Sequence, residues 1–350
     1  MLPTSPQSPE PLQLRAAALC MPAIALILAV GLLTDNPRAA LVATMGALSV
    51  GFGAFQQFTR HRSAPMLLAA LGMALSTGVG SWISGHETGL VLVSAVWAIG
   101  CAWLTAFGPG ASWIVLQWSI ALFVASAYPA DLVGAAGRAG VMLLGGLLQL
   151  AVVSGLWRLS SLTPPRRFGS VRAYLRLAHR MLPAARAALP YVVAAAVAVT
   201  LATLLEYSLE LSNGYWAPMT ALVVIRPGIG PTWSRVLHRT SGTIIGAGLA
   251  TLAAALLRPS QLETAALVLV FAYAAYVLRA SYYALFTIAI TGYVVLLLAL
   301  GGLPEPMSAL HRVLATALGA AISLLIVAAI EALTSLHARL LLKPRRSASR

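Results

Sequence analysis

The stretch HRVLATALGAAISLLIVAAIEALTS, residues 311–335, indicates the fold class of this chain. It contains no charged residue between Arg312 and Glu331, and a helix of about 20 apolar residues is what crosses the hydrocarbon core of a bilayer. Comparable apolar runs, separated by short segments with Gly, Pro or charge, recur from about Arg15 to Leu336. The sequence therefore predicts an all-α membrane protein.

Composition supports the same class for the whole chain. Charged residues make up 9% of the 350 residues, hydrophobic residues make up 59%, and the mean hydropathy is +0.86. A soluble domain carries roughly 25% charged residues, which cover its core with polar surface. The net charge of +14 lies mostly beside apolar runs, where membrane topology explains it more simply than nucleic-acid binding does. We therefore expect no nucleic-acid partner.

The apolar runs predict about twelve transmembrane helices. The first six are expected near 16–33, 38–57, 64–83, 88–107, 111–128 and 134–157. The second six are expected near 187–209, 215–229, 240–257, 263–278, 281–301 and 311–335. The span at 215–229 is short, with Pro218 inside it and Pro227 near its end.

The distribution of Lys and Arg predicts the topology of these helices. With the amino terminus inside the cell, 19 of the 23 Lys and Arg fall on the cytoplasmic side. The other four are Arg38, Arg138, Arg258 and Arg312. Cytoplasmic loops of membrane proteins are enriched in Lys and Arg, so this orientation is favoured. Both termini are then cytoplasmic.

The two halves are predicted to be tandem six-helix repeats. Arg62 follows the second span as Arg239 follows the eighth, and Arg138 opens the sixth span as Arg312 opens the twelfth. An even number of helices per unit makes the repeats parallel rather than inverted. The resulting division is a disordered cytoplasmic tail at 1–14, a degenerate first repeat at 15–158, a basic cytoplasmic linker at 159–186, a second repeat at 187–336 and a basic cytoplasmic tail at 337–350.

Within the linker, residues 171–186 place apolar side chains at nearly helical spacing with Arg between them. That pattern favours an amphipathic helix on the cytoplasmic surface, in contact with membrane lipids. A loop that only sets the topology is the alternative.

The densest polar cluster is YWAPMTALVVIRPGIGPTWSRVLHRTSGTIIGA, residues 215–247. Pro218 is expected to interrupt a spanning helix that ends near Arg226, while Arg235 and Arg239 share one helix face. Guanidinium groups bind carboxylates in a bidentate manner, so three of them near a broken helix favour an organic-anion site. Alternatively, these arginines are interface anchors that follow the positive-inside rule.

A second polar cluster is RASYYALFTIAIT, residues 279–291, which places hydroxyl groups along the eleventh span. These side chains either line a path or serve as boundary residues and bond their own helix backbone. The candidate substrate-binding residues are Arg226, Arg235, Arg239, Trp216, Thr220, Tyr283, Thr287 and Thr291. Residues expected to have structural roles, including the GxxxG spacing that favours close helix packing, are Pro218, Pro227, Gly242, Thr243 and Gly246.

The stretch 215–249 resembles the signature of the FUSC family, the fusaric acid resistance protein-like family. The family pattern runs Tyr-Trp-x-Pro-x-Thr, Arg-Pro, Thr-x-x-Arg-x-x-x-Arg and Gly-Thr-x-x-Gly. It falls here on Tyr215, Trp216, Pro218, Thr220, Arg226, Pro227, Thr232, Arg235, Arg239, Gly242, Thr243 and Gly246. The resemblance implies a bacterial inner-membrane bundle associated with efflux of aromatic carboxylic acids, and distant kinship to plant malate-channel proteins.

These observations lead to three functional hypotheses. The first is proton-driven export of small organic anions, chiefly aromatic acids. The second is a passive organic-anion channel, and the third is a membrane scaffold or assembly subunit that transports nothing. The only lysine is Lys343, no P-loop, HExxH, GxSxG or paired-Cys pattern occurs, and we expect neither an enzyme nor a cofactor or metal. The expected partners are small organic anions and membrane lipids, and the small-residue helix faces are compatible with a homodimer.

Overall fold

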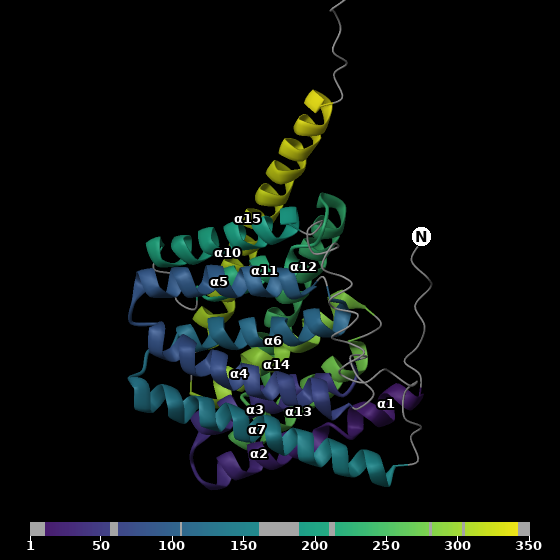
Figure 1. The fold of residues 1–350 in the computed structure, drawn as a ribbon. Coiled ribbons are helices and arrows are strands. Elements are labelled where there is room, and N and C mark those ends of the chain that lie inside the picture. Colours follow the sequence, from purple (N-terminus) through teal and green to yellow (C-terminus); the bar gives the residue numbers. More distant parts are fainter. Residues whose placement is uncertain are drawn as a thin grey trace, which may run out of the picture.

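The computed structural model describes residues 11–56, 62–105, 107–160, 189–209, 214–279, 282–302 and 305–341. Every regular element in these ranges is an α-helix, and the helices pack into one bundle (Figure 1). The predicted all-α class is therefore confirmed. The proposed linker helix at 171–186 lies outside the described residues, as do 1–10 and 342–350 of the two predicted tails.

The helices of the first half match the predicted apolar runs closely. They are α1 (Pro11–Ala18), α2 (Met21–Leu33), α3 (Pro37–Gly53), α4 (Ser63–Ile83), α5 (Glu87–Thr105), α6 (Pro109–Ser126) and α7 (Leu132–Leu159). Asn36 and Asp131 cap α3 and α7, because their side chains accept hydrogen bonds from backbone N–H groups of the first turn.

The second half contains six further helices. They are α10 (Leu189–Ser208), α11 (Trp216–Val224), α12 (Ile229–Leu257), α13 (Gln261–Leu278), α14 (Tyr283–Leu300) and α15 (Glu305–Leu341). The carboxyl-terminal part of α15 extends beyond the rest of the bundle (Figure 1).

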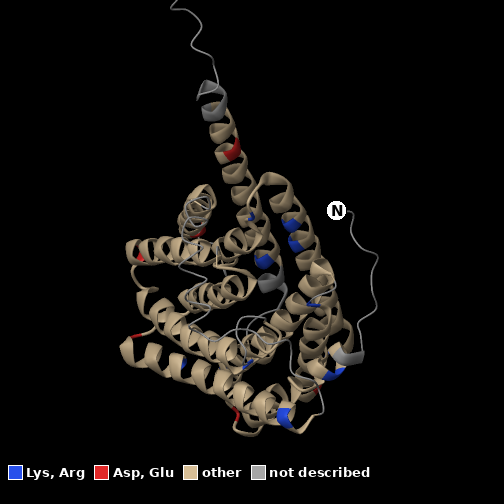
Figure 2. Cartoon of the chain, turned by 45° about the vertical axis from the view of Figure 1, so that its right-hand side comes forward, with Lys and Arg blue, Asp and Glu red and all other residues tan. Residues whose placement is uncertain are grey.

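Within the described ranges, ten helical segments are long and apolar enough to cross a membrane, so the chain is a multi-pass membrane protein. Large apolar side chains such as Leu75, Leu144 and Leu325 are more than 60% exposed, as lipid-facing residues are. Figure 2 shows few charged residues along the long helices. Among the described residues, the predicted spans at 38–57 and 215–229 form the shorter helices of the set, α3 with 17 residues and α11 with nine, and the other ten predicted spans match these ten segments.

The prediction of a span at 215–229 and a loop at 230–239 is wrong. The chain forms a nine-residue helix, α11, and then a turn at residues 225–228, after which α12 already begins at Ile229. Pro231 lies in the first turn of α12, where its missing N–H removes no intrahelical hydrogen bond. Arg235 and Arg239 therefore lie within a helix rather than in a cytoplasmic loop.

Helix neighbours recur between the two halves. In the first half α7 packs against α3 and α4, and α4 packs against α6, while in the second half α15 packs against α11 and α12, and α12 packs against α14. Across the halves, α5 packs against α10 and α2 packs against α13. This correspondence supports the tandem repeats at 15–158 and 187–336, which we propose.

Two glycine contacts follow the same correspondence. A Cβ atom on Gly145 would collide with the carbonyl oxygen of Ala43, and a Cβ atom on Gly319 would collide with that of Ala217. The sequence offset that relates Arg138 to Arg312 also relates these two pairs. The contact between α3 and α7 in the first half thus corresponds to the contact between α11 and α15 in the second half.

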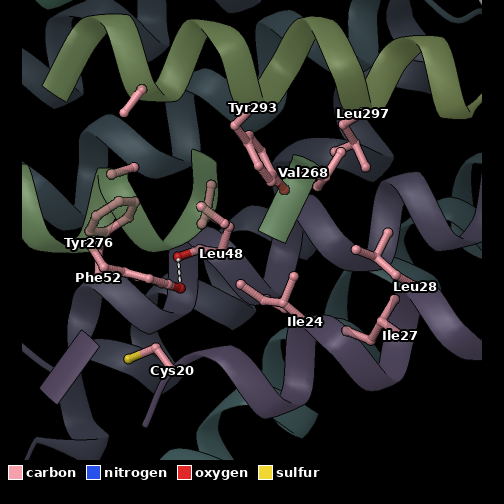
Figure 3. Packing of buried hydrophobic residues seen from close by; sticks show 14 of the residues in the cluster. Cys20, Ile24, Ile27, Leu28, Leu48, Phe52, Val268, Tyr276, Tyr293 and Leu297 are labelled. Atoms are coloured by element: carbon pink, nitrogen blue, oxygen red, sulfur yellow. Dashed lines mark hydrogen bonds between the residues drawn. The ribbon is translucent and has the colours of Figure 1, made fainter. Parts of the chain in front are cut away.

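Two large apolar clusters hold the bundle together. One joins α2, α3 and α4 to α12, α13 and α14, and the hydroxyl of Tyr276 in it donates to the carbonyl oxygen of Leu48 at 2.8 Å (Figure 3). The other joins α5, α6 and α10 to α11 and α15. The short helix α11 is therefore enclosed by packed helices on several sides.

Candidate functional site

All nine residues of α11 are buried, which is unusual for a helix of a membrane bundle. Pro218 lies in its first turn and therefore does not interrupt it, contrary to the sequence prediction. The helix ends instead at Val224, and the break in the chain is the turn that contains Arg226 and Pro227.

Thr232 of α12 fixes this turn. Its hydroxyl accepts a hydrogen bond from the backbone N–H of Arg226 at 3.0 Å and lies 2.9 Å from the carbonyl oxygens of Arg226 and Gly228. Gly228 has a φ of +97°, a conformation in which a side chain would be strained. The Glu331 carboxylate of α15 accepts from the N–H of Ile229 at 3.0 Å, so it caps the start of α12.

Arg226 and Arg235 lie near this turn. Nη1 of Arg226 donates to the carbonyl oxygen of Ile225 at 2.6 Å, and the side chain is half-buried. The guanidinium of Arg235 lies over the ring of Tyr283 in α14, with Cζ 3.5 Å from the ring centroid. Arg226 lies in the turn before α12, and Arg235 and Arg239 lie one helical turn apart within α12, so the three arginines form a series that runs from the turn into the helix.

Arg239 lies one turn further along α12, inside the bundle. Its side chain is 6% exposed and its Nε has no hydrogen-bond partner. The backbone of α12 comes close to α14 at this level, because a Cβ on Gly242 would lie 2.7 Å from Cβ of Thr287 and one on Gly246 would lie 2.6 Å from the carbonyl oxygen of Ile288. These glycines let Arg239 and the threonines of α14 share one region.

The threonine hydroxyls of this region have different partners. Thr287 donates to the carbonyl oxygen of Tyr283 at 2.8 Å and Thr243 donates to that of Arg239 at 2.8 Å, so both bond their own helices. Thr291 accepts from Arg312 at 3.5 Å, and the hydroxyl of Thr220 has no partner. All four side chains are buried.

Arg312 is the residue of this region that sequence reasoning missed. Its position at the start of the predicted span 311–335 placed it at the outer side of the membrane, yet it lies two turns inside α15 and its side chain is 2% exposed. Cζ lies 3.7 Å from the ring centroid of Trp216, and among the described residues no carboxylate pairs with it. The available signal was an arginine at the edge of an otherwise uncharged run, at the same offset from Arg138 as the other repeat positions.

The site as a whole carries positive charge and an excess of hydrogen-bond donors. Guanidinium groups donate only, and described carboxylates make no ion pair with Arg226, Arg235, Arg239 or Arg312. Such a region suits an anion rather than a cation. Among the described residues, no group of three His, Cys, Asp or Glu side chains is arranged to hold a metal ion.

Comparison with known proteins places this region in a family. The model described as Fusaric acid resistance protein-like matches residues 189–326. Over 137 residues the chain is 32% identical to the "Uncharacterized membrane protein YvaC" of Bacillus subtilis (strain 168), an alignment that covers 37% of this chain and 20% of that protein. This chain thus matches about a fifth of the length of that relative, and no solved structure matches. Residues 189–326, which run from α10 into α15, thus match the model of the fusaric acid resistance protein-like family, as the signature at 215–246 predicts.

Proposed function

We propose that this protein exports small organic anions, chiefly aromatic carboxylates, across a bacterial inner membrane, with both termini in the cytoplasm. The observation that carries the proposal is the series Arg226, Arg235 and Arg239, which runs from a turn into the bundle without a described carboxylate partner. Its start at a Lys/Arg-rich side, cytoplasmic by the positive-inside rule, fits uptake of the anion from the cytoplasm.

In this proposal the arginines act in sequence. Arg226 and Arg235 attract the anion at the turn, and Arg239 draws it between α12 and α14. The ring of Tyr283 contacts one face of the Arg235 guanidinium. Because a cation–π contact uses the face of the guanidinium, its edge, which carries the N–H donors, is left for the anion. Efflux is coupled to proton entry.

Glu206 in α10 is the candidate proton carrier. It is a half-buried acid in an apolar span, a setting in which ionisable residues are usually functional. Glu331, an acid in the apolar helix α15, caps α12 and therefore has a structural partner. Glu206→Gln is therefore expected to abolish the response to a pH gradient while the protein still binds anion.

A passive organic-anion channel is the second candidate. It is favoured by the absence of a described carboxylate beside the arginines, since a coupled exchanger needs a proton site linked to its anion site. An interior-negative membrane potential drives anions outward by about 2.3 kcal/mol per charge per 100 mV, so export needs no coupling.

The experiment is flux of labelled 4-hydroxybenzoate from liposomes that contain the purified protein. A pH gradient with the potential clamped at zero drives flux only in the coupled exchanger, and a potassium-diffusion potential without a pH gradient drives it in the channel. Arg239→Gln is expected to reduce either flux about tenfold or more, since a charged donor to the anion is lost. Arg258→Gln, which removes an exposed arginine at the other end of α12, is the matched control. No flux under either condition, in protein shown to be folded, would contradict the proposal.

A further inference from the structure

We propose that Arg312 and Arg239 form a closed anion-binding site between α11, α12, α14 and α15, where the carboxylate of the transported acid is held. The inference deepens the proposed function and rests on it only for the choice of a carboxylate as ligand.

Several buried donors of this region have no acceptor. They are Nε and Nη1 of Arg312, Nε of Arg239 and the hydroxyls of Thr220 and Thr316, none of which has a hydrogen-bond partner. The four side chains are at most 6% exposed. A buried polar group without a partner is costly, and a buried guanidinium without one is costlier still. An anion bound beside the two arginines would supply the acceptors that their guanidiniums lack.

Four helices contribute polar residues near Arg312. Each carries a pair one turn apart: Trp216 and Thr220 in α11, Arg239 and Thr243 in α12, Thr287 and Thr291 in α14, and Arg312 and Thr316 in α15. Helix α15 packs against α11, α12 and α14, and Arg312 contacts both Trp216 of α11 and Thr291 of α14. Arg312 therefore lies where α15 meets these neighbouring helices.

Arg312 and Arg239 are both buried, and like charges repel each other in a low-dielectric interior. No described carboxylate neutralises either charge, so this region carries an uncompensated positive charge. Trp216 covers one face of the Arg312 guanidinium and leaves its edge, which carries the N–H donors, available to a ligand.

Arg138 shows that this arrangement is not required by the fold. It occupies the position in α7 that corresponds to Arg312 in α15. Its Nη1 donates to the hydroxyl of Ser81 at 3.3 Å and to the carbonyl oxygen of Tyr128, and its side chain is only half-buried. The arginine at this position thus donates to a carbonyl oxygen and a hydroxyl in the first half, whereas in the second half Nη2 of Arg312 donates to Thr291 and its Nε and Nη1 have no partner.

The test is equilibrium binding of sodium benzoate to the full-length protein in detergent, followed by titration calorimetry and by the shift in thermal unfolding midpoint. Arg312→Gln is expected to weaken binding about tenfold or more and to remove the benzoate-induced shift, because a charged donor is lost. Arg312→Lys keeps the charge without the planar donors, and its affinity for benzoate is expected to lie between those of Arg312→Gln and the unaltered protein. Thr316→Val, which preserves shape, is expected to weaken binding about 2- to 10-fold.

Arg138→Gln is the matched control and is expected to bind benzoate as the unaltered protein does. Equal losses in Arg138→Gln and Arg312→Gln, or unchanged binding in both Arg312→Gln and Thr316→Val, would overturn the inference. If Arg312→Gln does not fold, Arg312→Lys and Thr316→Val decide the question alone.

The binding experiment and the transport experiment distinguish failure of the proposed site from failure of the proposed function. Benzoate binding that depends on Arg312 in a protein without liposome flux would support the site and reject the proposed function. Flux that persists in Arg312→Gln with unchanged benzoate affinity would support the function and reject this site.

Discussion

The Arg235 guanidinium lies over the ring of Tyr283, with 3.5 Å between Cζ and the ring centroid, and so joins the two polar stretches of the second half. Tyr283→Leu removes the aromatic face and is expected to raise the KM for 4-hydroxybenzoate flux about 2- to 5-fold, since a cation–π contact is worth about 0.5–1 kcal/mol at a partly exposed site. Tyr283→Phe keeps the ring and is the control. Equal effects of the two substitutions would show that the hydroxyl, not the ring, matters.

The close approach of α12 to α14 gives a prediction on stability. Gly246→Ala places a Cβ 2.6 Å from the carbonyl oxygen of Ile288 and is expected to destabilise the protein by about 1–3 kcal/mol, because the helices must move apart. A Cβ on Gly248 meets nothing within 4 Å, so Gly248→Ala is expected to be neutral or slightly stabilising. Thermal unfolding in detergent compares the two variants, and similar midpoints would contradict the packing described here.

Two buried tyrosines of the apolar cluster give a matched pair. The hydroxyl of Tyr276 donates to Leu48 and that of Tyr293 has no partner, although both rings are fully buried (Figure 3). Tyr276→Phe is expected to cost about 1 kcal/mol of unfolding free energy, whereas Tyr293→Phe is expected to cost nothing or to stabilise. Chemical denaturation measures both, and a larger loss for Tyr293→Phe would indicate an acceptor for its hydroxyl.

The cap formed by Glu331 separates a structural role from a proton-carrying one. Glu331→Gln retains an oxygen that accepts from the N–H of Ile229 and is expected to change stability little. Glu331→Ala removes the cap and is expected to lower stability by about 1 kcal/mol. Unfolding midpoints test the cap, and loss of pH-driven flux in Glu331→Gln at normal stability would assign the proton to this residue instead of Glu206.

An uncompensated buried charge should also affect the protein without ligand. Arg312→Met fills a similar volume without a charge and is expected to raise the free energy of unfolding of the benzoate-free protein by roughly 1 kcal/mol or more. The unfolding midpoint should rise accordingly. The same variant should show no further rise when benzoate is added. A lower midpoint without benzoate would mean that Arg312 has a stabilising partner in the folded protein.

Much of the fold follows from the sequence because lipid imposes one simple requirement. Helices such as α4 and α13 coincide with predicted runs within one or two residues, since an apolar run bounded by Gly, Pro or charge has few alternatives in a bilayer. The exception is α11, whose apolar residues are covered by protein rather than lipid. Hydropathy does not distinguish these two surroundings.

The candidate site was only partly predictable for a related reason. The signature identified Arg226, Arg235 and Arg239, but whether an arginine at a helix end reaches water or faces inward depends on how the helix is rotated. That rotation is set for Arg312 by the contact of α15 with α11 at Gly319 and Ala217. The start of α12 was missed because Gly and Pro usually mark a loop, whereas here they form its first turn.

The complete burial of α11 has a consequence for biosynthesis. A segment that never contacts lipid gains little from partitioning out of the translocon, so its placement depends on the helices that cover it. One of these is α15, which leaves the ribosome after α11. A nascent chain that ends before α15 would leave Trp216 and Thr220 uncovered. Such a chain is expected to be recognised and degraded by quality-control proteases.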